Sequence, residues 1–179
     1  MHHDFKFSTA SDEDIIASVK ALEKRCEDYK IPKPVTIGYP LGDVWPDSEK
    51  LLHDMGYLWG RGSMIDCSPR VAGDSWYDPY GDSPLVVPNI HANTKEMLIA
   101  AVNGAVKNKA LLLVFHNVEH IDPMMNPIDF EEVVSTIYEN SGSCVTFRDL
   151  SEYVDPVKAW DYIHPVMPEQ PVFMPPGIE

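Results

Sequence analysis

His116 is the residue whose place in the chain most favours a chemical role. It follows six uncharged apolar residues, Ala110 to Phe115, within the segment Lys109 to Val118. An apolar run of that length between polar residues predicts a buried parallel strand. Ligands and catalytic groups gather at the carboxyl ends of such strands, and an imidazole can exchange protons near neutral pH. A histidine hydrogen-bonded in the turn after the strand is an equally good interpretation.

The elements before this strand alternate between helix and strand. Ser11 precedes three acidic residues, which is typical of a capped helix start, and Pro32 and Pro34 end that helix. Gly56 stands where a left-handed C-cap is wanted. We expect a helix over 11–30, a strand over 35–37 that enters the turn 38–42, a helix over 47–55 and a strand over 57–61.

The second half begins with a long excursion. Residues 62–93 lack periodicity, and the acidic and aromatic cluster 74–82 favours an ordered, functional loop. A mainly parallel sheet with crossover helices should follow. We expect a strand over 85–87, a helix from its cap Thr94, a helix from its cap Asp129 to Gly142, a strand over 144–145, a helix over 146–154, and an extended tail over 155–179 with six prolines.

Composition narrows the classes of partner. The formal charge of −14, from 28 acidic and 14 basic residues among 179, repels phosphate backbones and anionic lipid surfaces. We therefore expect no nucleic acid and no membrane as partner, and no stretch of the chain reads as a membrane span or an export signal. The three cysteines, Cys26, Cys67 and Cys144, are odd in number and widely spaced, which predicts small buried residues without a disulfide or zinc motif.

Four segments together carry a resemblance: TIGYPLG, GYLWGRG, LLLVFHNV and IDFEEVVSTIYENSGSCVTFRDLSEYV. They resemble the later two-thirds of the polysaccharide deacetylase family, the NodB-homology carbohydrate esterases. The resemblance implies an α/β fold, a partial and distorted (β/α) barrel, because only about five strands are expected where a full barrel takes roughly 250 residues. Residues 1–154 would form a deacetylase domain lacking its first strand and motif, and residues 155–179 a proline-rich tail.

The same resemblance implies a metal and an acid. His116 would be the general acid that protonates the leaving amine or alcohol. His3 matches a metal ligand and His2 the variable position before it. The ion would be zinc, or else cobalt or nickel. The family uses two earlier aspartates, one as a metal ligand and one as a general base, and their positions fall before Met1. Without them the metal would lack a ligand, and no base would activate the water. An appended or frayed terminus is the alternative interpretation of the first residues.

The family's R-x-P-Y substrate motif corresponds to residues 38–41, with glycine for the arginine and leucine for the tyrosine. Tyr39 and Leu41 would line the substrate, and the Leu41 N–H could still serve an oxyanion. Arg61 could replace the missing cation, unless it forms a surface ion pair. Trp76 could stack on a sugar ring, although a small core cluster beneath a long loop is the commoner reason for such aromatics.

The resemblance therefore implies a metal-dependent hydrolase that deacetylates a carbohydrate or a related amide and is incomplete as given. The alternative is a catalytically inactive remnant of the same fold that binds carbohydrate or acts as a scaffold. In both interpretations the partner is a carbohydrate, and an open barrel seam would favour self-association. Members of the family are often secreted or periplasmic.

Overall fold

The computed structural model describes residues 5–61, 76–91, 95–104, 110, 112–114 and 127–165. These residues form a mixed α/β structure. Its elements are, in chain order and with η for 3-10 helices, η1 (Phe7–Thr9), α1 (Asp12–Asp28), β1 (Thr36–Gly38), η2 (Pro40–Gly42), α2 (Pro46–Asp54), β2 (Trp59–Arg61), η3 (Pro84–Val86), β3 (Asn89–His91), α3 (Lys95–Gly104), β4 (Leu112–Val114), α4 (Pro127–Glu139), α5 (Phe147–Leu150) and α6 (Pro156–Ile163).

The strands pair in parallel, as the sequence predicted. Strand β1 pairs with β2, so that Gly38 lies opposite Arg61, and β3 pairs with β4 in the same sense. A parallel bridge between Arg61 and Val87 joins the two pairs, with the Val87 N–H donating to the Gly60 carbonyl at 2.8 Å. Within the described residues, the strands therefore form two two-stranded parallel sheets, each of which pairs consecutive strands.

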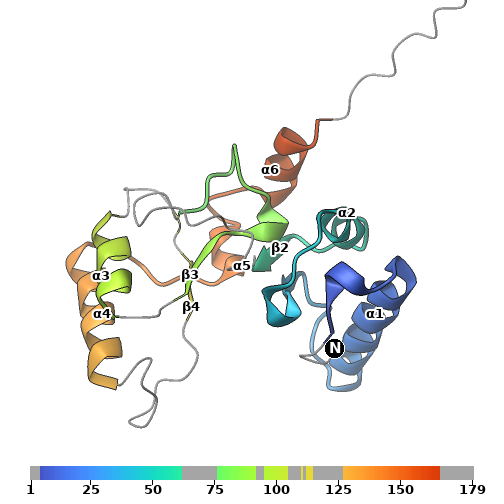
Figure 1. Ribbon diagram of the computed structural model, residues 1–179, viewed down its shortest axis with the longest axis horizontal. Coiled ribbons are helices and arrows are strands. Elements are labelled where there is room, and N and C mark those ends of the chain that lie inside the picture. The colour runs from blue at the N-terminus through green and yellow to red at the C-terminus, as the bar shows by residue number, and fades with distance from the viewer. Residues whose placement is uncertain are drawn as a thin grey trace, which may run out of the picture.

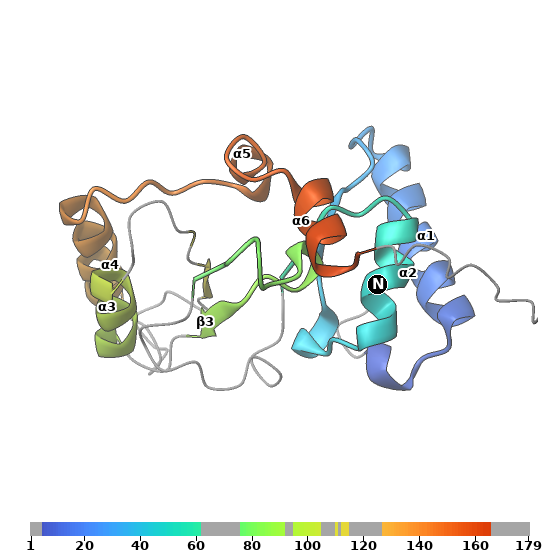
Figure 2. The same ribbon diagram turned by 90° about the horizontal axis from the view of Figure 1, so that it is seen from above.

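The molecule is long, with helices at both ends. Helices α1 and α2 lie at one end of its longest axis, α3 and α4 at the other, and the short strands lie between them (Figures 1 and 2). The largest cluster of buried side chains joins α1, α2 and Trp160 of α6 around Tyr39 and Leu52. A second cluster surrounds Trp59, and Leu98 and Val133 form a third between α3 and α4.

Local signals at the first two helices are confirmed. The Ser11 hydroxyl accepts a hydrogen bond from the Asp14 N–H, and α1 turns Ile15 and Val19 into the core. After α2, Gly56 takes the left-handed conformation with φ of +87°, which glycine adopts without steric cost. These starts and ends follow from residues a few positions apart, so tertiary contacts hardly alter them.

Several expected strands and caps are wrong. Residues 84–86 form η3 instead of a strand, because the Ser83 hydroxyl accepts from the Leu85 N–H and Pro84 sets the first turn. Residues 144 and 145 form no strand. Helix α4 begins at Pro127, so Asp129 lies in its first turn and pairs with Lys95 of α3 at 3.1 Å.

The end of the described chain also differs from the expectation. Pro156–Ile163 is helix α6, not an extended segment, because the Asp155 carboxylate accepts from the N–H groups of Val157 and Lys158. Trp160 of this helix is buried. Cys144 is exposed rather than buried, and Cys67 lies outside the described residues. Among the helices that the structure describes, none is long and apolar enough to cross a membrane.

Candidate functional site

The turn that follows β1 is strained and firmly held. Leu41 has a φ of +57° and is 45% exposed, and a bulky residue rarely occupies this left-handed region. The N–H groups of Gly42 and Asp43 donate to Tyr39 and Pro40, each at 3.0 Å. Ser8 donates through both its N–H and its hydroxyl to the Asp43 carboxylate at 2.9 Å. Such strain persists where the surroundings fix it, and it is concentrated at functional sites.

Tyr39 lies beneath this turn and not on its surface. Its side chain is fully buried and meets Phe7 edge to face at a centroid distance of 5.4 Å. Burial, with a contribution from the Glu49 charge, raises the pKa of its phenol. The neighbouring Ser48 hydroxyl opposes this rise in the pKa. That hydroxyl donates its hydrogen bond to the Trp45 carbonyl at 2.6 Å. The Tyr39 phenol therefore has no hydrogen-bond partner within the described residues. Tyr39 can therefore reach a ligand only through its backbone.

Arg61 lies beside the end of β1. It is half-buried at the end of β2, and its side chain reaches across to Gly38 on the neighbouring strand. A Cβ placed on Gly38 would be 3.7 Å from Nε of Arg61 and 3.9 Å from Nη2. The guanidinium thus occupies the space above the residue that lacks a side chain. The alternative role offered for Arg61, a surface ion pair, is not formed with any described residue.

A second polar group, which the sequence analysis missed, lies between α2, η3 and α6. The indole of Trp160 stacks on His53 at 4.4 Å and on His164 at 3.8 Å, and His164 Nδ1 lies 3.3 Å from the Trp160 carbonyl. Burial raises the pKa of the Glu49 carboxyl, while the Ser83 hydroxyl and the His164 ring oppose the shift. The spacing of Trp160 and His164 by four residues was the available signal.

The aromatic loop divides into buried and exposed members. Tyr77 is buried against Trp59, 5.6 Å between centroids, which agrees with the small core cluster that the sequence offered as one interpretation. Trp76 is half-buried. Tyr80 is 70% exposed and meets Tyr162 of α6 edge to face at 5.1 Å, so these two rings face solvent together.

An apolar groove lies beside β4. Strand residues line one side of it and the segment leading into α5 the other; its lining is Val87, Ala110, Leu112, Val145, Thr146, Phe147 and Leu150. Thr146 caps α5 through a reciprocal pair of hydrogen bonds with Asp149, which fixes the segment next to the groove. The groove is a continuation of the core around Trp59.

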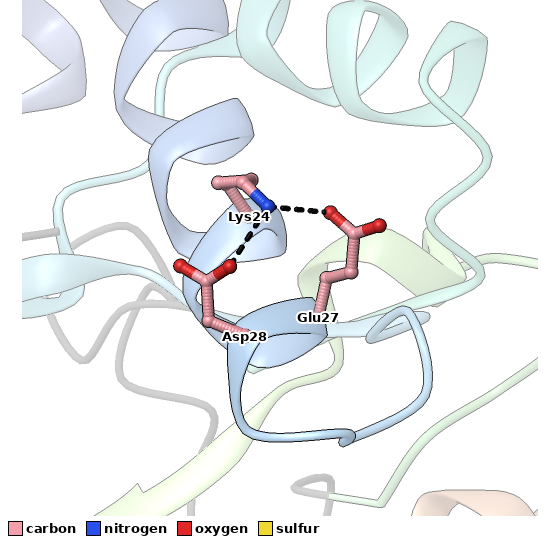
Figure 3. Close-up of polar contacts among 3 residues, drawn as sticks. All are labelled: Lys24, Glu27 and Asp28. Atoms are coloured by element: carbon pink, nitrogen blue, oxygen red, sulfur yellow. Dashed lines mark hydrogen bonds and ion pairs between the residues drawn. The ribbon is translucent and has the colours of Figure 1, made fainter.

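Surface charge is distributed in small ion pairs. On α1, Lys24 lies between Glu27 and Asp28, at 3.0 and 2.8 Å (Figure 3), and all three side chains are exposed. Such pairs stabilise a solvated helix face only slightly. No group of three histidine, cysteine or carboxylate side chains that could hold a metal occurs in the part of the chain that the structure describes.

The structure brings together only part of the predicted site. Arg61 and the turn that carries Leu41 lie at the ends of neighbouring strands. The predicted acid His116 and the predicted metal ligands His2 and His3 lie outside the described residues. Comparison of the chain with models of known families, with curated proteins and with solved structures finds no match.

Proposed function

We propose that this chain is a deacetylase-like hydrolase that acts on an acetylated carbohydrate or a related amide. One observation supports the proposal most. The parallel strands β1 and β2 end side by side in a strained, tightly bonded turn and a half-buried guanidinium. In α/β proteins, loops after parallel strands are where substrates bind. Strand β4, also parallel, continues in sequence to His116.

Each residue then has a distinct task. His116 protonates the leaving nitrogen or oxygen, and the Leu41 N–H donates to the oxygen on which negative charge develops. Arg61 contacts the substrate, and Trp76 or Tyr80 stacks on a sugar ring. His2 and His3 are the candidate ligands of a divalent ion, which would supply an activated water when bound. The described residues hold no complete ligand set for that ion.

The fold that suits this proposal is a partial, distorted (β/α) barrel. Support comes from the chain-order pairing of the described strands. The bridge sets Arg61, the last residue of β2, opposite Val87, two residues before β3 begins. A stagger of this kind between neighbours is what tilted strands need in order to curve into a barrel.

A carbohydrate-binding protein without catalysis is the second candidate. The observation that favours it is the exposed pair Tyr80 and Tyr162, which come from separate segments and present two aromatic rings to solvent. Aromatic rings offer an apolar face to sugars and a polar edge to water. This function needs neither an acid nor a metal, so it predicts binding of a sugar without release of acetate.

Acetate release from an acetylated oligosaccharide, with zinc or cobalt supplied, tests the proposal. His116→Ala should lower turnover about 10²–10⁴-fold, the usual effect of losing a general acid, with little change in substrate binding. His120→Ala is the matched control, four residues further along the chain, and should be nearly neutral. Equal effects of the two substitutions would exclude His116 as the acid. Sugar binding without any acetate release by the unaltered chain would favour the second candidate.

A further inference from the structure

The guanidinium of Arg61 is placed unusually for this chain. Acidic residues outnumber basic ones by 28 to 14, and the lysines at positions 24, 33, 50, 95 and 158 each pair with a carboxylate. Five other described basic residues form no ion pair within the described part of the chain, but all five are exposed: Lys6, Lys20, Arg25, Lys30 and Arg148. Arg61 makes no ion pair or hydrogen bond with another described residue. It is half-buried, at the end of a strand rather than on an exposed helix face.

The neighbouring strand makes room for this side chain. Gly38 is the register partner of Arg61. A Cβ built on Gly38 would lie 3.7 Å from Nε of Arg61, which is an ordinary contact distance. Gly38 does not have a positive φ, so its backbone does not require glycine. Glycine at this position leaves space for the Arg61 side chain, and a branched side chain at position 38 would fill that space.

No described residue accepts a hydrogen bond from the guanidinium, so its N–H donors can pair with a ligand. The planar fork of these donors matches a carboxylate, which can accept two parallel hydrogen bonds. The net charge of −14 opposes anions over the whole surface, so a carboxylate needs a local cation to stay bound. Attraction at a half-buried site is screened less than attraction between exposed groups.

We propose that Arg61, seated over Gly38, binds a carboxylate at the substrate edge of the sheet. This inference rests on the proposed function, and it narrows the substrate to an acetylated carbohydrate that carries acidic sugar residues. Released acetate offers the same carboxylate chemistry at the same residue. The two sources differ in size, because only the sugar chain also reaches the surrounding loops.

Calorimetric binding to the full chain tests the inference without requiring catalysis. The probes are a uronic-acid oligosaccharide, the same oligosaccharide with its carboxyl groups reduced to alcohols, and sodium acetate. The unaltered chain should bind the acidic oligosaccharide roughly tenfold or more tighter than the reduced one, as a charge-assisted bidentate contact implies. Competition by acetate would mean that the product shares the site, and its failure to compete would assign the site to the sugar.

Three substitutions and one control decide the role of the guanidinium. Arg61→Gln should abolish the preference for the acidic oligosaccharide, and Arg61→Lys should keep part of it, since the charge remains but the fork is lost. Gly38→Val, which keeps the arginine, should weaken the preference by displacing the guanidinium. Arg25→Gln, on the exposed face of α1, should leave the preference intact. Circular dichroism checks that each variant folds. If Arg61→Gln does not fold, the two single variants Gly38→Val and Arg61→Lys test whether the guanidinium binds the carboxylate.

Two results would overturn the carboxylate site: equal binding of both oligosaccharides by the unaltered chain, or a preference that survives Arg61→Gln and Gly38→Val. Failure of the proposed function looks different. In that case the acidic oligosaccharide binds through Arg61, yet no acetate is released whatever residue stands at position 116.

Discussion

At the scale of single residues, the core beneath the β1 turn contains polar groups that it satisfies only in part. The Tyr39 phenol is fully buried and has no hydrogen-bond partner within the described residues. An unsatisfied buried polar group costs about 1–3 kcal/mol. Glu49 of α2 lies nearby, half-buried, with its pKa raised mainly by desolvation. Both groups lower the stability of the region that positions Leu41.

The raised pKa of Glu49 predicts a stability that depends on pH. Because the folded pKa exceeds the unfolded one, this group's contribution is fully present below the unfolded pKa and is lost as pH rises through the folded pKa. Glu49→Gln should therefore stabilise the fold at pH 7, by up to about 1 kcal/mol after solvent screening, and not at pH 4. Urea unfolding at both pH values measures this difference. Glu152→Gln, on the exposed surface, should change neither value, and an equal gain at both pH values would contradict the assignment.

The sequence located some residues of the candidate site correctly and misjudged one. Arg61 was expected at the end of a strand and Leu41 in the turn that follows one, and both lie there. Tyr39 was expected to meet the substrate, but the alternation of buried Ile37, exposed Gly38 and buried Tyr39 turns its ring into the core. The period of two was visible in the sequence and could have given this result. His116, His2 and His3 remain predictions.

At the scale of elements, local chemistry decided what could be predicted. Caps such as Ser11 and Gly56 act within a few residues, so α1 and α2 were correct to within about two residues. The run Leu85 to Val87 suggested a strand by propensity, but Ser83 and Pro84 impose a turn. Helix α6 was missed because prolines dominate the composition after Asp155. Asp155 and Pro156 nevertheless match the cap and first position of a helix.

The contact between β2 and η3 predicts an intolerant position. Gly60 is buried, and a Cβ there would overlap the backbone carbonyl of Leu85, which cannot move like a flexible side chain. Gly60→Ala should cost about 1–3 kcal/mol of unfolding free energy through overpacking. Thermal or urea unfolding checks it. Gly81→Ala is the control, since its Cβ would meet only the Asp78 carboxylate at 3.7 Å, and comparable losses for both variants would contradict the contact.

At the scale of the whole molecule, the described strands form two two-stranded parallel sheets, so each strand has an outer edge. Within the described residues, β1 pairs only with β2 and β4 pairs only with β3. An unpaired strand edge is a template for another chain. Among the described strands, no pairing closes the sheets into a ring. Because these edges are unpaired within the described residues, we still expect the protein to self-associate.

We expect the protein to associate through the β1 edge at micromolar concentration or above. Val35, directly before β1, is 42% exposed, and a lysine there should weaken pairing with a second chain. Val35→Lys should shift the sedimentation equilibrium towards monomer. Val157→Lys alters a similarly exposed valine on α6, at 48%, and should leave the equilibrium unchanged. A monomer that binds no hydrophobic dye before either substitution would rule out an open edge.

The packing of Gly60 also constrains which residues related sequences can carry at this position. The clash that excludes other residues at position 60 comes from backbone atoms of Leu85, so no compensating change in the side chain at 85 would relieve it. Relatives that keep the contact should retain glycine at position 60, while position 85 accepts other residues of similar bulk. Position 38 behaves differently, because its glycine leaves room for one side chain. A small residue at position 38, glycine or alanine, should therefore accompany arginine at position 61 across a lineage.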